Sequence, residues 1–466
     1  MTPKTALTAP KAGPEFLQHP IAALASGAAA AAVAIVRLSG RECHALLARC
    51  FQPTGVAAWS ERELRLGRLI LPETGAVLDE VMAVKFAGPR SYTGEDMAEV
   101  HCHGGPYVVQ RVLALFYSLG FRPAEPGEYT RRAFLNGKLD LTAAEGIREL
   151  AAAASAQQWV AARHLAAGKL KDAVQDLRTA LVQTLAHLEA QIDFPDEGDV
   201  ARAALAHVKE RAADVACRIQ RLLASYGSGR VASQGLMVAL CGEPNAGKST
   251  LLNELLGKER AIVTPHAGTT RDYLEESCLV DGRLVRLVDM AGLRESTDPV
   301  EALGIEAARR LARTADLVLF LAPADGADGA RATAAWIDEF SPKDALRILT
   351  KADLGKPAWA AGWTEVSCKD GRGLDELRTQ LAGKVDRHMD GLGAEDAFVT
   401  TARQAAALTA AAQAIQAFDA AYARGNYEEM LAFELHEAAR ALQSIIGEVG
   451  SEDVLDAVFR EFCVGK

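Results

Sequence analysis

Residues 236–257, LMVALCGEPNAGKSTLLNELLG, constrain the fold of this chain more than any other stretch. A buried-strand pattern, a glycine-containing loop and a helix pattern follow one another without a gap. The loop GEPNAGKS, Gly242 to Ser249, fits G-x-x-x-x-G-K-[ST], in which backbone N–H groups and a helix N-terminus face an anion. Such strand–loop–helix units belong to open parallel sheets. The stretch therefore predicts a doubly wound α/β domain with a phosphate site.

The same alternation continues along the chain and sets the limits of this domain. Further strand patterns, RLVRLVDM, DLVLFLA, ALRILT and WTEVSC, alternate with helical segments until about Val385. We expect a Ras-like α/β domain over residues 231–385.

Helical segments flank the α/β region on both sides. Ala-rich helices are predicted for 142–193 and 201–226, and three more follow residue 396: RQAAALTAAAQAIQAFDAAYARG, YEEMLAFELHEAARALQSIIG and SEDVLDAVFREF. The first set is too elongated to close a core alone. We therefore expect one helical domain, formed by 126–230 and 386–466, into which the α/β domain is inserted; two unrelated helical domains are the alternative.

The N-terminal region, 1–125, mixes short strand patterns with one helix pattern, which indicates an α+β domain. Its apolar run IAALASGAAAAAVAIV, 21–36, is too short and too rich in Ala and Gly for a spanning helix, and a Pro-containing leader precedes it. A strand after an Ala/Gly loop is the better interpretation. HCH at 101–103 is not expected to bind metal, because a strand alternates its side chains between two faces.

Length, charge and cysteine content limit the number of domains, the kind of partner and the cellular compartment. A chain of 466 residues suggests two to four domains, and a net charge of −10 argues against nucleic-acid binding over the whole surface. The eight cysteines are scattered without a C-x-x-C pair, which favours a reducing compartment over a disulfide framework. We expect a cytoplasmic protein that does not use a membrane.

Three segments after the phosphate loop identify the nucleotide. DMAG begins at Asp289, which suits a water-mediated Mg²⁺ contact, and ends at Gly292, which suits a γ-phosphate sensor. TKAD ends at Asp353, whose carboxylate accepts from guanine N1–H and N2–H₂, a donor pair that adenine lacks. SCK, Ser367 to Lys369, offers backbone N–H groups to guanine O6. Together these segments predict a GTPase.

Two features affect hydrolysis and affinity. Thr350 stands where the base motif normally begins with Asn, so we expect weaker nucleotide binding with guanine selectivity kept. Leu293 stands where Ras-like enzymes place a water-orienting Gln, so the hydrolytic group must lie elsewhere. The loop called switch I in GTPases is expected in VTPHAGTTRD, 263–272.

The residues predicted to contact GTP come from these five segments. They are Gly242, Asn245, Ala246, Gly247, Lys248, Ser249, Thr250, Thr264, Pro265, His266, Ala267, Gly268, Thr269, Thr270, Asp289, Met290, Ala291, Gly292, Thr350, Lys351, Ala352, Asp353, Ser367, Cys368 and Lys369. Lys248 reaches the β/γ-phosphate oxygens, and the hydroxyls of Ser249 and Thr270 are the expected Mg²⁺ ligands.

GEPNAGKS, AGTTRD, DMAGLRE and E-x-x-G-I-E, together with SYTGED, PGEYTRRAFLNGKLDLTAAE, DFPDE and the terminal C-x-G-K, resemble the MnmE (TrmE) family of tRNA-modifying GTPases, in the TrmE-Era-EngA-like class. The resemblance extends over nearly the whole chain. It implies a K⁺ ion in place of an arginine finger, held by Asn245, Thr264, His266 and Thr269 when two G domains pair. It also implies that Glu301 orients the attacking water, so the catalytic set is Glu301, Lys248, Asn245 and Cys463.

The resemblance further implies a one-carbon chemistry in the N-terminal domain. That domain is similar to tetrahydrofolate-binding domains, and the matching positions are Arg37, Glu99, Lys138 and Lys466. The implied one-carbon donor is 5,10-methylenetetrahydrofolate, with 5-formyltetrahydrofolate as an analogue. Family members usually carry a Pro/Gly-rich loop with an Arg before Arg37. Here SGAAAAAVAIV replaces it, which puts folate affinity in question.

The implied partners are tRNA, a second copy joined through the N-terminal domain, and the flavoprotein MnmG with its FAD in a heterotetramer. The implied product carries a carboxymethylaminomethyl or aminomethyl group on C5 of wobble uridine, U34. Two alternatives stay open: a switch GTPase of ribosome assembly, and a divergent member without folate chemistry.

The chain ends in EFCVGK. CVGK is not a prenylation box, because Gly465 is not aliphatic and Lys466 is not an accepted last residue. Ser451 followed by two acids starts a helix that we expect to carry Cys463 toward an N-terminal domain, that of a partner subunit. Cys463 is either a nucleophile or a positioning group.

Overall fold

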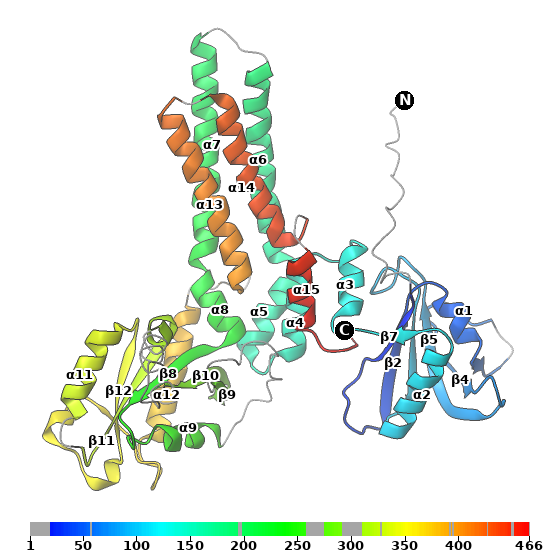
Figure 1. Ribbon diagram of the computed structural model, residues 1–466, viewed down its shortest axis with the longest axis horizontal. Coiled ribbons are helices and arrows are strands. Elements are labelled where there is room, and N and C mark those ends of the chain that lie inside the picture. Colours follow the sequence, from blue (N-terminus) through cyan, green and yellow to red (C-terminus); the bar gives the residue numbers. More distant parts are fainter. Residues whose placement is uncertain are drawn as a thin grey trace, which may run out of the picture. The chain divides into compact units, whose positions relative to one another are not determined.

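The computed structural model describes residues 19–55, 58–193, 198–257, 275–290, 310–326, 329–390, 393, 396–425, 427–448 and 452–465 (Figure 1). The chain forms two compact units. One consists of Met1–Ala144 with Gly450–Lys466, and the other is Glu145–Val449.

The N-terminal unit contains a seven-stranded sheet in the order β3-β4-β5-β6-β2-β1-β7. Its strands are β1 (Ile21–Leu24), β2 (Val33–Ser39), β3 (Phe51–Pro53), β4 (Arg65–Ile70), β5 (Val77–Phe86), β6 (Met97–His103) and β7 (Arg122–Pro123). Neighbouring strands are antiparallel, except β1 and β7. The helices are α1 (Cys43–Ala48), α2 (Pro106–Ser118) and α3 (Glu128–Leu135).

The apolar run 21–36 lies in this sheet, as expected. Its two ends form β1 and most of β2, which pair with each other, and Val36 and Leu38 are fully buried. The intervening Ala/Gly loop returns to the sheet at Ala31, whose N–H donates to the Gly104 carbonyl at 3.2 Å. Burial of both strands in the core of the N-terminal unit thus explains the hydrophobicity of this run.

The C-terminal arm, by which we mean residues 452–465, packs on the N-terminal unit of its own chain. Helix α15 (Glu452–Arg460) places Phe459 in a small core with Leu141, and Phe462 belongs to the same core. Arg131 pairs with Asp456 at 2.9 Å. The expectation that this arm reaches a partner subunit's domain is therefore not what the structure shows, because two aromatic rings are buried against their own chain.

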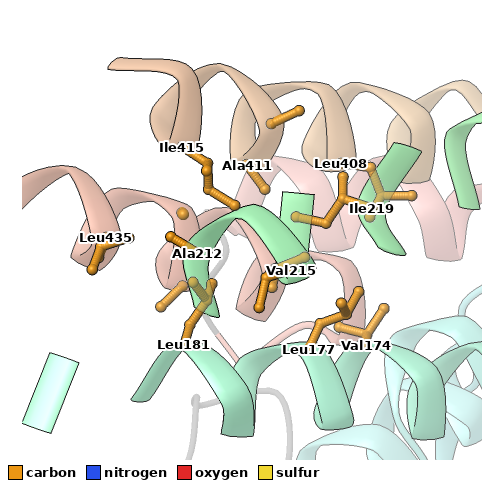
Figure 2. Packing of buried hydrophobic residues seen from close by; sticks show 14 of the residues in the cluster. Val174, Leu177, Leu181, Ala212, Val215, Ile219, Leu408, Ala411, Ile415 and Leu435 are labelled. Carbon is orange, nitrogen blue, oxygen red and sulfur yellow. The ribbon is translucent and has the colours of Figure 1, made fainter. Parts of the chain in front are cut away.

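Four long helices form the bundle of the second unit (Figure 2). They are α6 (Lys169–Asp193), α7 (Gly198–Ala224), α13 (Ala402–Ala423) and α14 (Glu428–Ile446), and their apolar faces share one core. Leu177 and Leu181 of α6, Val215 of α7 and Ile415 of α13 point into it. Helices from both sides of the α/β region share this core, as the predicted insertion requires. Residues 126–144 and 450–466, which we expected in the helical domain, belong instead to the N-terminal unit. Shorter helices, α4 (Leu141–Ala152), α5 (Ala156–Ala166) and α8 (Tyr226–Gln234), precede the α/β region.

The inserted region contains a six-stranded sheet in the order β13-β12-β11-β8-β10-β9. The strands are β8 (Leu236–Gly242), β9 (Glu275–Val280), β10 (Arg283–Asp289), β11 (Leu317–Pro323), β12 (Ala345–Thr350) and β13 (Thr364–Glu365). All neighbours are parallel except β9 and β10, which form a hairpin. Its turn residues, Asp281 and Gly282, both have positive φ, as a type I′ turn requires.

Helices α9 (Lys248–Leu256), α11 (Gly329–Phe340) and α12 (Leu374–Met389) accompany this sheet, with short 3₁₀ turns η3 (Ala352–Leu354) and η4 (Ala358–Ala360). Strands β8, β10, β11 and β12 run parallel, so their carboxyl ends meet at one edge. Ligands of open α/β sheets bind at that edge. No helix within the described ranges is long and apolar enough to cross a membrane.

Candidate functional site

The phosphate loop joins the carboxyl end of β8 to the first residue of α9. Gly242 lies so close to β11 that a Cβ there would sit 2.7 Å from the Leu321 carbonyl oxygen, so glycine is required. Asn245 and Gly247 have φ of 64° and 86°, the left-handed conformation that Asn and Gly tolerate best. The backbone therefore has the bends of an anion-binding loop.

Lys248 is held over this loop. Its Nζ donates to the carbonyls of Gly242 and Glu243, both at 2.9 Å, and only 7% of the residue is exposed. These two bonds keep the ammonium group at the mouth of the loop. Ser249 and Thr250 follow it on α9 and are exposed.

Thr350 connects the phosphate loop to the base-binding segment. Its hydroxyl donates to the Ala246 carbonyl at 2.7 Å, and both residues are almost fully buried. A Cβ on Gly247 would lie 3.6 Å from the Thr350 side chain. Thr350 therefore makes one side-chain hydrogen bond to the phosphate loop, although it lacks the amide group of Asn.

Asp353 has the environment expected of a base-binding carboxylate. Ser367 Oγ donates to its Oδ1 at 3.2 Å, and Lys369 Nζ lies 3.6 Å from its Oδ2. The Ser367 N–H donates to the Arg372 carbonyl at 2.9 Å. Ser367 therefore orients Asp353, and within SCK the N–H groups of Cys368 and Lys369 are the candidates for guanine O6.

The other predicted nucleotide residues divide into two groups. Asp289 ends β10 in register with Leu240, and Met290 donates to the Leu240 carbonyl at 3.2 Å, so both lie beside the end of β8. Lys351 pairs with Asp325 at 3.0 Å, and Ala352 donates to the Val366 carbonyl at 3.2 Å. Outside the described residues lie Thr264, Pro265, His266, Ala267, Gly268, Thr269, Thr270, Ala291, Gly292, Glu301 and Lys466.

A second constellation lies on the N-terminal sheet. Arg37 of β2 and Glu99 of β6 are register partners, and Arg37 Nη2 lies 2.9 Å from Glu99 Oε1. The guanidinium lies 5.7 Å from the ring centres of both Tyr92 and Tyr129. About a fifth of each charged side chain is exposed, so the pair is accessible from solvent.

The C-terminal arm reaches this pair. Arg37 Nη1 donates to the Gly465 carbonyl at 3.3 Å, and the Gly127 N–H donates to the Cys463 carbonyl at 3.4 Å. Cys463 itself is exposed. Lys138, from the same predicted set, donates from Nζ to the Pro89 carbonyl at 2.9 Å. The structure therefore brings Arg37, Glu99 and Gly465 together.

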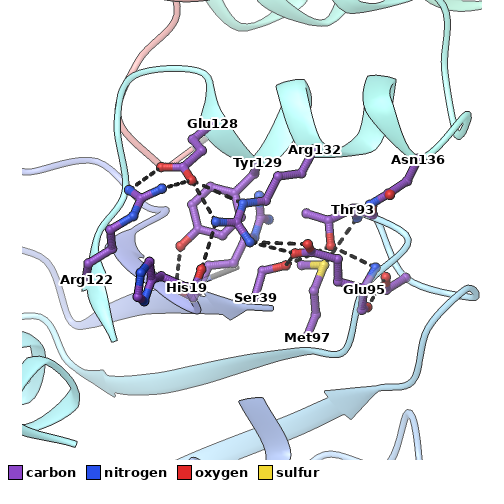
Figure 3. Close-up of polar contacts among 12 residues, drawn as sticks. His19, Ser39, Thr93, Glu95, Met97, Arg122, Glu128, Tyr129, Arg132 and Asn136 are labelled. Carbon is purple, nitrogen blue, oxygen red and sulfur yellow. Dashed lines mark hydrogen bonds and ion pairs between the residues drawn. The ribbon is translucent and has the colours of Figure 1, made fainter. Parts of the chain in front are cut away.

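A buried charge network supports this site, and the sequence analysis did not single it out (Figure 3). Arg132 is fully buried and donates to Glu95 at 3.0 Å and Glu128 at 2.8 Å. Burial by itself raises the pKa of the Glu128 carboxyl, but hydrogen bonds from Arg122, the Glu125 N–H and Arg132 outweigh it and hold that pKa below its ordinary value. The signal lay in SYTGED and EYTRRAF, which contain Glu95 and Arg132.

Two family models match the chain. One, described as the MnmE helical domain, covers residues 141–463, and the other, described as the N-terminus of the GTP-binding protein TrmE, covers residues 20–138. The chain belongs to the MnmE family. Tandem matches of an N-terminal model and a helical model that encloses the inserted sheet agree with the architecture described above.

Relatives named MnmE match this chain along nearly their whole length. The tRNA modification GTPase MnmE of Methylorubrum populi is 43% identical over 451 residues, which is 96% of this chain and 98% of that protein. The Akkermansia muciniphila protein of the same name is 39% identical over 96% of this chain and 99% of its own. Among solved structures, the G domain of the T. maritima FeoB iron transporter is 25% identical, covers 32% of this chain and 98% of its own, and gives a TM-score of 0.25.

Proposed function

We propose that this member of the MnmE family is a GTPase that takes part in the modification of tRNA. One observation carries the proposal: Thr350 hydrogen-bonds the phosphate loop at the edge of a parallel sheet, and Ser367 holds the nearby Asp353, our proposed guanine acceptor, by a hydrogen bond of 3.2 Å. The relatives that match 96% of the chain are named tRNA modification GTPases. A nucleotide bound here spans both segments.

The metal ligands belong to the same loop. Ser249, exposed at the start of α9, has a hydroxyl oxygen, which hard cations such as Mg²⁺ prefer, and Thr270 is its proposed companion. Asn245 projects from a left-handed backbone position and is exposed, which suits the proposed K⁺ ligand. Thr264, His266 and Thr269 complete the K⁺ set in our proposal. When bound by these residues, the two cations would supply positive charge against the phosphates.

Glu301 is the proposed residue that orients the attacking water, since Leu293 offers no hydrogen-bonding group at the position used by Ras-like enzymes. Lys248 stabilises charge on the β/γ oxygens. We propose that turnover requires K⁺ and pairing of two G domains. Replacing KCl by NaCl at equal ionic strength should then abolish most GTP turnover, and equal rates in the two salts would contradict the K⁺ assignment.

The N-terminal site is proposed to hold a one-carbon tetrahydrofolate. The accessible carboxylate of Glu99 suits the amide and amino edge of a pterin, and Arg37 fixes that carboxylate by a direct ion pair. Lys138 and Lys466 complete the proposed folate set. The group supplies a carbon for C5 of wobble uridine, with glycine or ammonia as nitrogen source and FAD on the proposed partner MnmG for redox chemistry. Homodimerisation through the N-terminal domain is part of the proposal.

The decisive experiment is mass spectrometry of wobble nucleosides from a strain that lacks this gene. Loss of the C5-modified uridine, restored by the wild-type gene, is the expected result, and its persistence in the deletion strain would refute the tRNA assignment. Complementation with Glu301→Ala should fail because turnover is lost, while GTP affinity persists in the purified variant. Cys463→Ser should also fail to restore the nucleoside but keep full GTP turnover.

The same strain separates the two alternatives. A divergent member without folate chemistry would keep its GTP turnover. Complementation with the wild-type gene would then restore no C5-modified uridine, and titration would detect no binding of 5-formyltetrahydrofolate. A ribosome-assembly switch would instead change the ratio of ribosomal subunits in the deletion strain and leave its tRNA nucleosides unchanged.

A further inference from the structure

A hollow of about 530 Å³ opens on the N-terminal unit beside the Arg37–Glu99 pair. It is lined by Arg62, Phe86, Arg90, Ser91, Tyr92 and Lys138. Three of these six residues are cations, two are aromatic, and no lining residue is acidic. Such a lining suits a ligand with a planar apolar part and several negative charges.

The cations of the hollow are arranged around one backbone segment. Arg62 Nη2 donates to the Arg90 carbonyl at 2.8 Å, and Lys138 Nζ donates to the neighbouring Pro89 carbonyl at 2.9 Å. These acceptors are uncharged, so the two contacts do not themselves neutralise either positive charge. Arg90 lies 3.4 Å from Glu61, but that pair is exposed and correspondingly weak.

Tyr92 connects the hollow to the proposed pterin site. Its ring lines the hollow, and the Arg37 guanidinium lies 5.7 Å from its centre. Arg37 in turn contacts Glu99 and the Gly465 carbonyl of the C-terminal arm. Tyr92 thus links Arg37, which contacts both Glu99 and the arm, to the hollow that contains the three cations.

We propose that this hollow is a subsite for the poly-γ-glutamyl tail of the folate, with Arg62, Arg90 and Lys138 as its charge partners. The inference rests on the folate site proposed above and names the form of the ligand. A monoglutamate carries two carboxylates, whereas each added glutamyl residue brings one more, so three cations fit a tail of two or more residues. The aromatic rings of Phe86 and Tyr92 suit the aminobenzoyl group between heterocycle and tail.

The test is titration of the full-length protein with the mono- and triglutamate forms of 5-formyltetrahydrofolate. We expect the wild type to bind the triglutamate at least about tenfold more tightly, since each charge-assisted contact contributes measurably. Arg62→Gln/Arg90→Gln should bring that ratio close to one and weaken the triglutamate more than the monoglutamate, because Glu99 and Arg37 remain for the heterocycle and Lys138 remains for one carboxylate. Gln keeps a donor for the Arg90 carbonyl while removing the charge.

Arg68→Gln is the matched control. Arg68 pairs with Glu80 on the same sheet, is 59% exposed and does not line the hollow, so its loss should leave the tail preference intact. Equal wild-type affinity for the two forms, or an equal loss of both in the double variant, would overturn the tail subsite alone. Failure of the wild type to bind even the monoglutamate would overturn the folate site and the subsite with it. A double variant that loses tRNA binding but keeps the tail preference would reassign the hollow to phosphates.

Discussion

Thr350 occupies the position at which the guanine motif of other GTPases begins with asparagine. Its hydroxyl carries one proton, and that proton is used on the Ala246 carbonyl at 2.7 Å. Thr350 can therefore brace the phosphate loop but has no second donor to offer a bound base. In our proposal, base recognition falls to Asp353 and the SCK segment, and guanine selectivity does not depend on residue 350.

Removing the Thr350 hydroxyl should weaken nucleotide binding. Thr350→Val leaves the buried Ala246 carbonyl without its donor, and we expect the Kd for GTP to rise about tenfold. Thr350→Ser should restore wild-type affinity. Isothermal titration measures both, and Thr379→Val is the control, because Thr379 makes a comparable hydroxyl bond on the exposed side of α12. Equal affinities for Thr350→Val and wild type would show that the brace is unimportant.

Glu145 and Glu149 lie one turn apart on α4 and differ in their partners. Glu145 accepts from Arg403 at 2.8 Å and from Gln404 at 2.7 Å. Glu149 is 13% exposed, and one of its oxygens has no hydrogen-bond partner among the described residues. Burial raises the pKa of Glu149 to about 7, which Arg148 and Ser233 only partly oppose and Glu145 reinforces.

This raised pKa predicts a stability that falls as pH rises. Between the ordinary carboxyl pKa of 4.5 and about 7 the folded state binds more protons than the unfolded state. The free energy of unfolding therefore decreases through this window, by on the order of 3 kcal/mol in total. Glu149→Gln should remove the slope and stabilise the protein at pH 8, as measured by urea unfolding at pH 5 and pH 8. Glu210→Gln, on an 85% exposed side chain of α7, should leave the slope unchanged.

Among the secondary-structure elements, α15 shows how a short helix gains a fixed position. Nine residues are too few for a stable isolated helix in water, so its order depends on packing. Phe459 and Phe462 supply that packing. Gly127 lacks a side chain, which allows Phe459 and Phe462 to lie close to its backbone. A Cβ on Gly127 would lie 2.6 Å from the Phe459 carbonyl oxygen and 2.9 Å from Phe462 Cβ.

Gly127→Ala should therefore displace the C-terminal arm. The position has φ of 68°, so the substitution adds both a clash and backbone strain. We expect faster hydrogen–deuterium exchange in residues 452–465 and loss of wobble-uridine modification, with GTP turnover unchanged. Gly75→Ala separates the two effects, since Gly75 has φ of 71° but open space around it. Unchanged exchange of the arm in Gly127→Ala would contradict this account.

At the scale of the whole molecule, the G domain is carried by a bundle whose helices come from both sides of it. Arg403 at the start of α13 joins these sides, because it bonds Glu145 of α4 and the carbonyls of Ser444 and Ile445 at the end of α14. The Glu145 carboxylate is 3% exposed. Loss of Arg403 would leave a buried charge without its main partner.

Arg403→Met should destabilise the helical unit by about 3 kcal/mol, since breaking a buried pair leaves one ion unpaired. Urea unfolding followed by helical circular dichroism is the measurement, with GTP binding recorded separately to report on the inserted domain. Arg440→Met provides the comparison on the same bundle, because Arg440 is 68% exposed in its pair with Glu437 and should cost less than about 1 kcal/mol. If Arg403→Met and Arg440→Met had equal urea midpoints of unfolding, Arg403 would not be important for the stability of the helical unit.

Much of the architecture could be predicted because its signals are local. The hairpin at Asp281-Gly282 follows from turn chemistry, and the strand–loop–helix at 236–256 follows from periodicity and fixed spacing. The insertion could be predicted because an elongated helical pair needs partners to bury its apolar face, and the sequence offers further long helices after the α/β region. The folate residues came from family resemblance and remain proposals.

The sequence by itself determined the α/β insertion, the phosphate loop and the guanine segment, because each depends on residues close together in the chain. Only the tertiary structure decided that the arm packs on its own N-terminal unit, that Thr350 braces Ala246 and that Arg62, Arg90 and Lys138 surround one hollow. These features join residues from 28 to more than 300 positions apart, as for Arg62 and Arg90 or Phe134 and Phe459. Their position is set by which apolar surfaces and charges find partners on folding, and no local pattern encodes that choice.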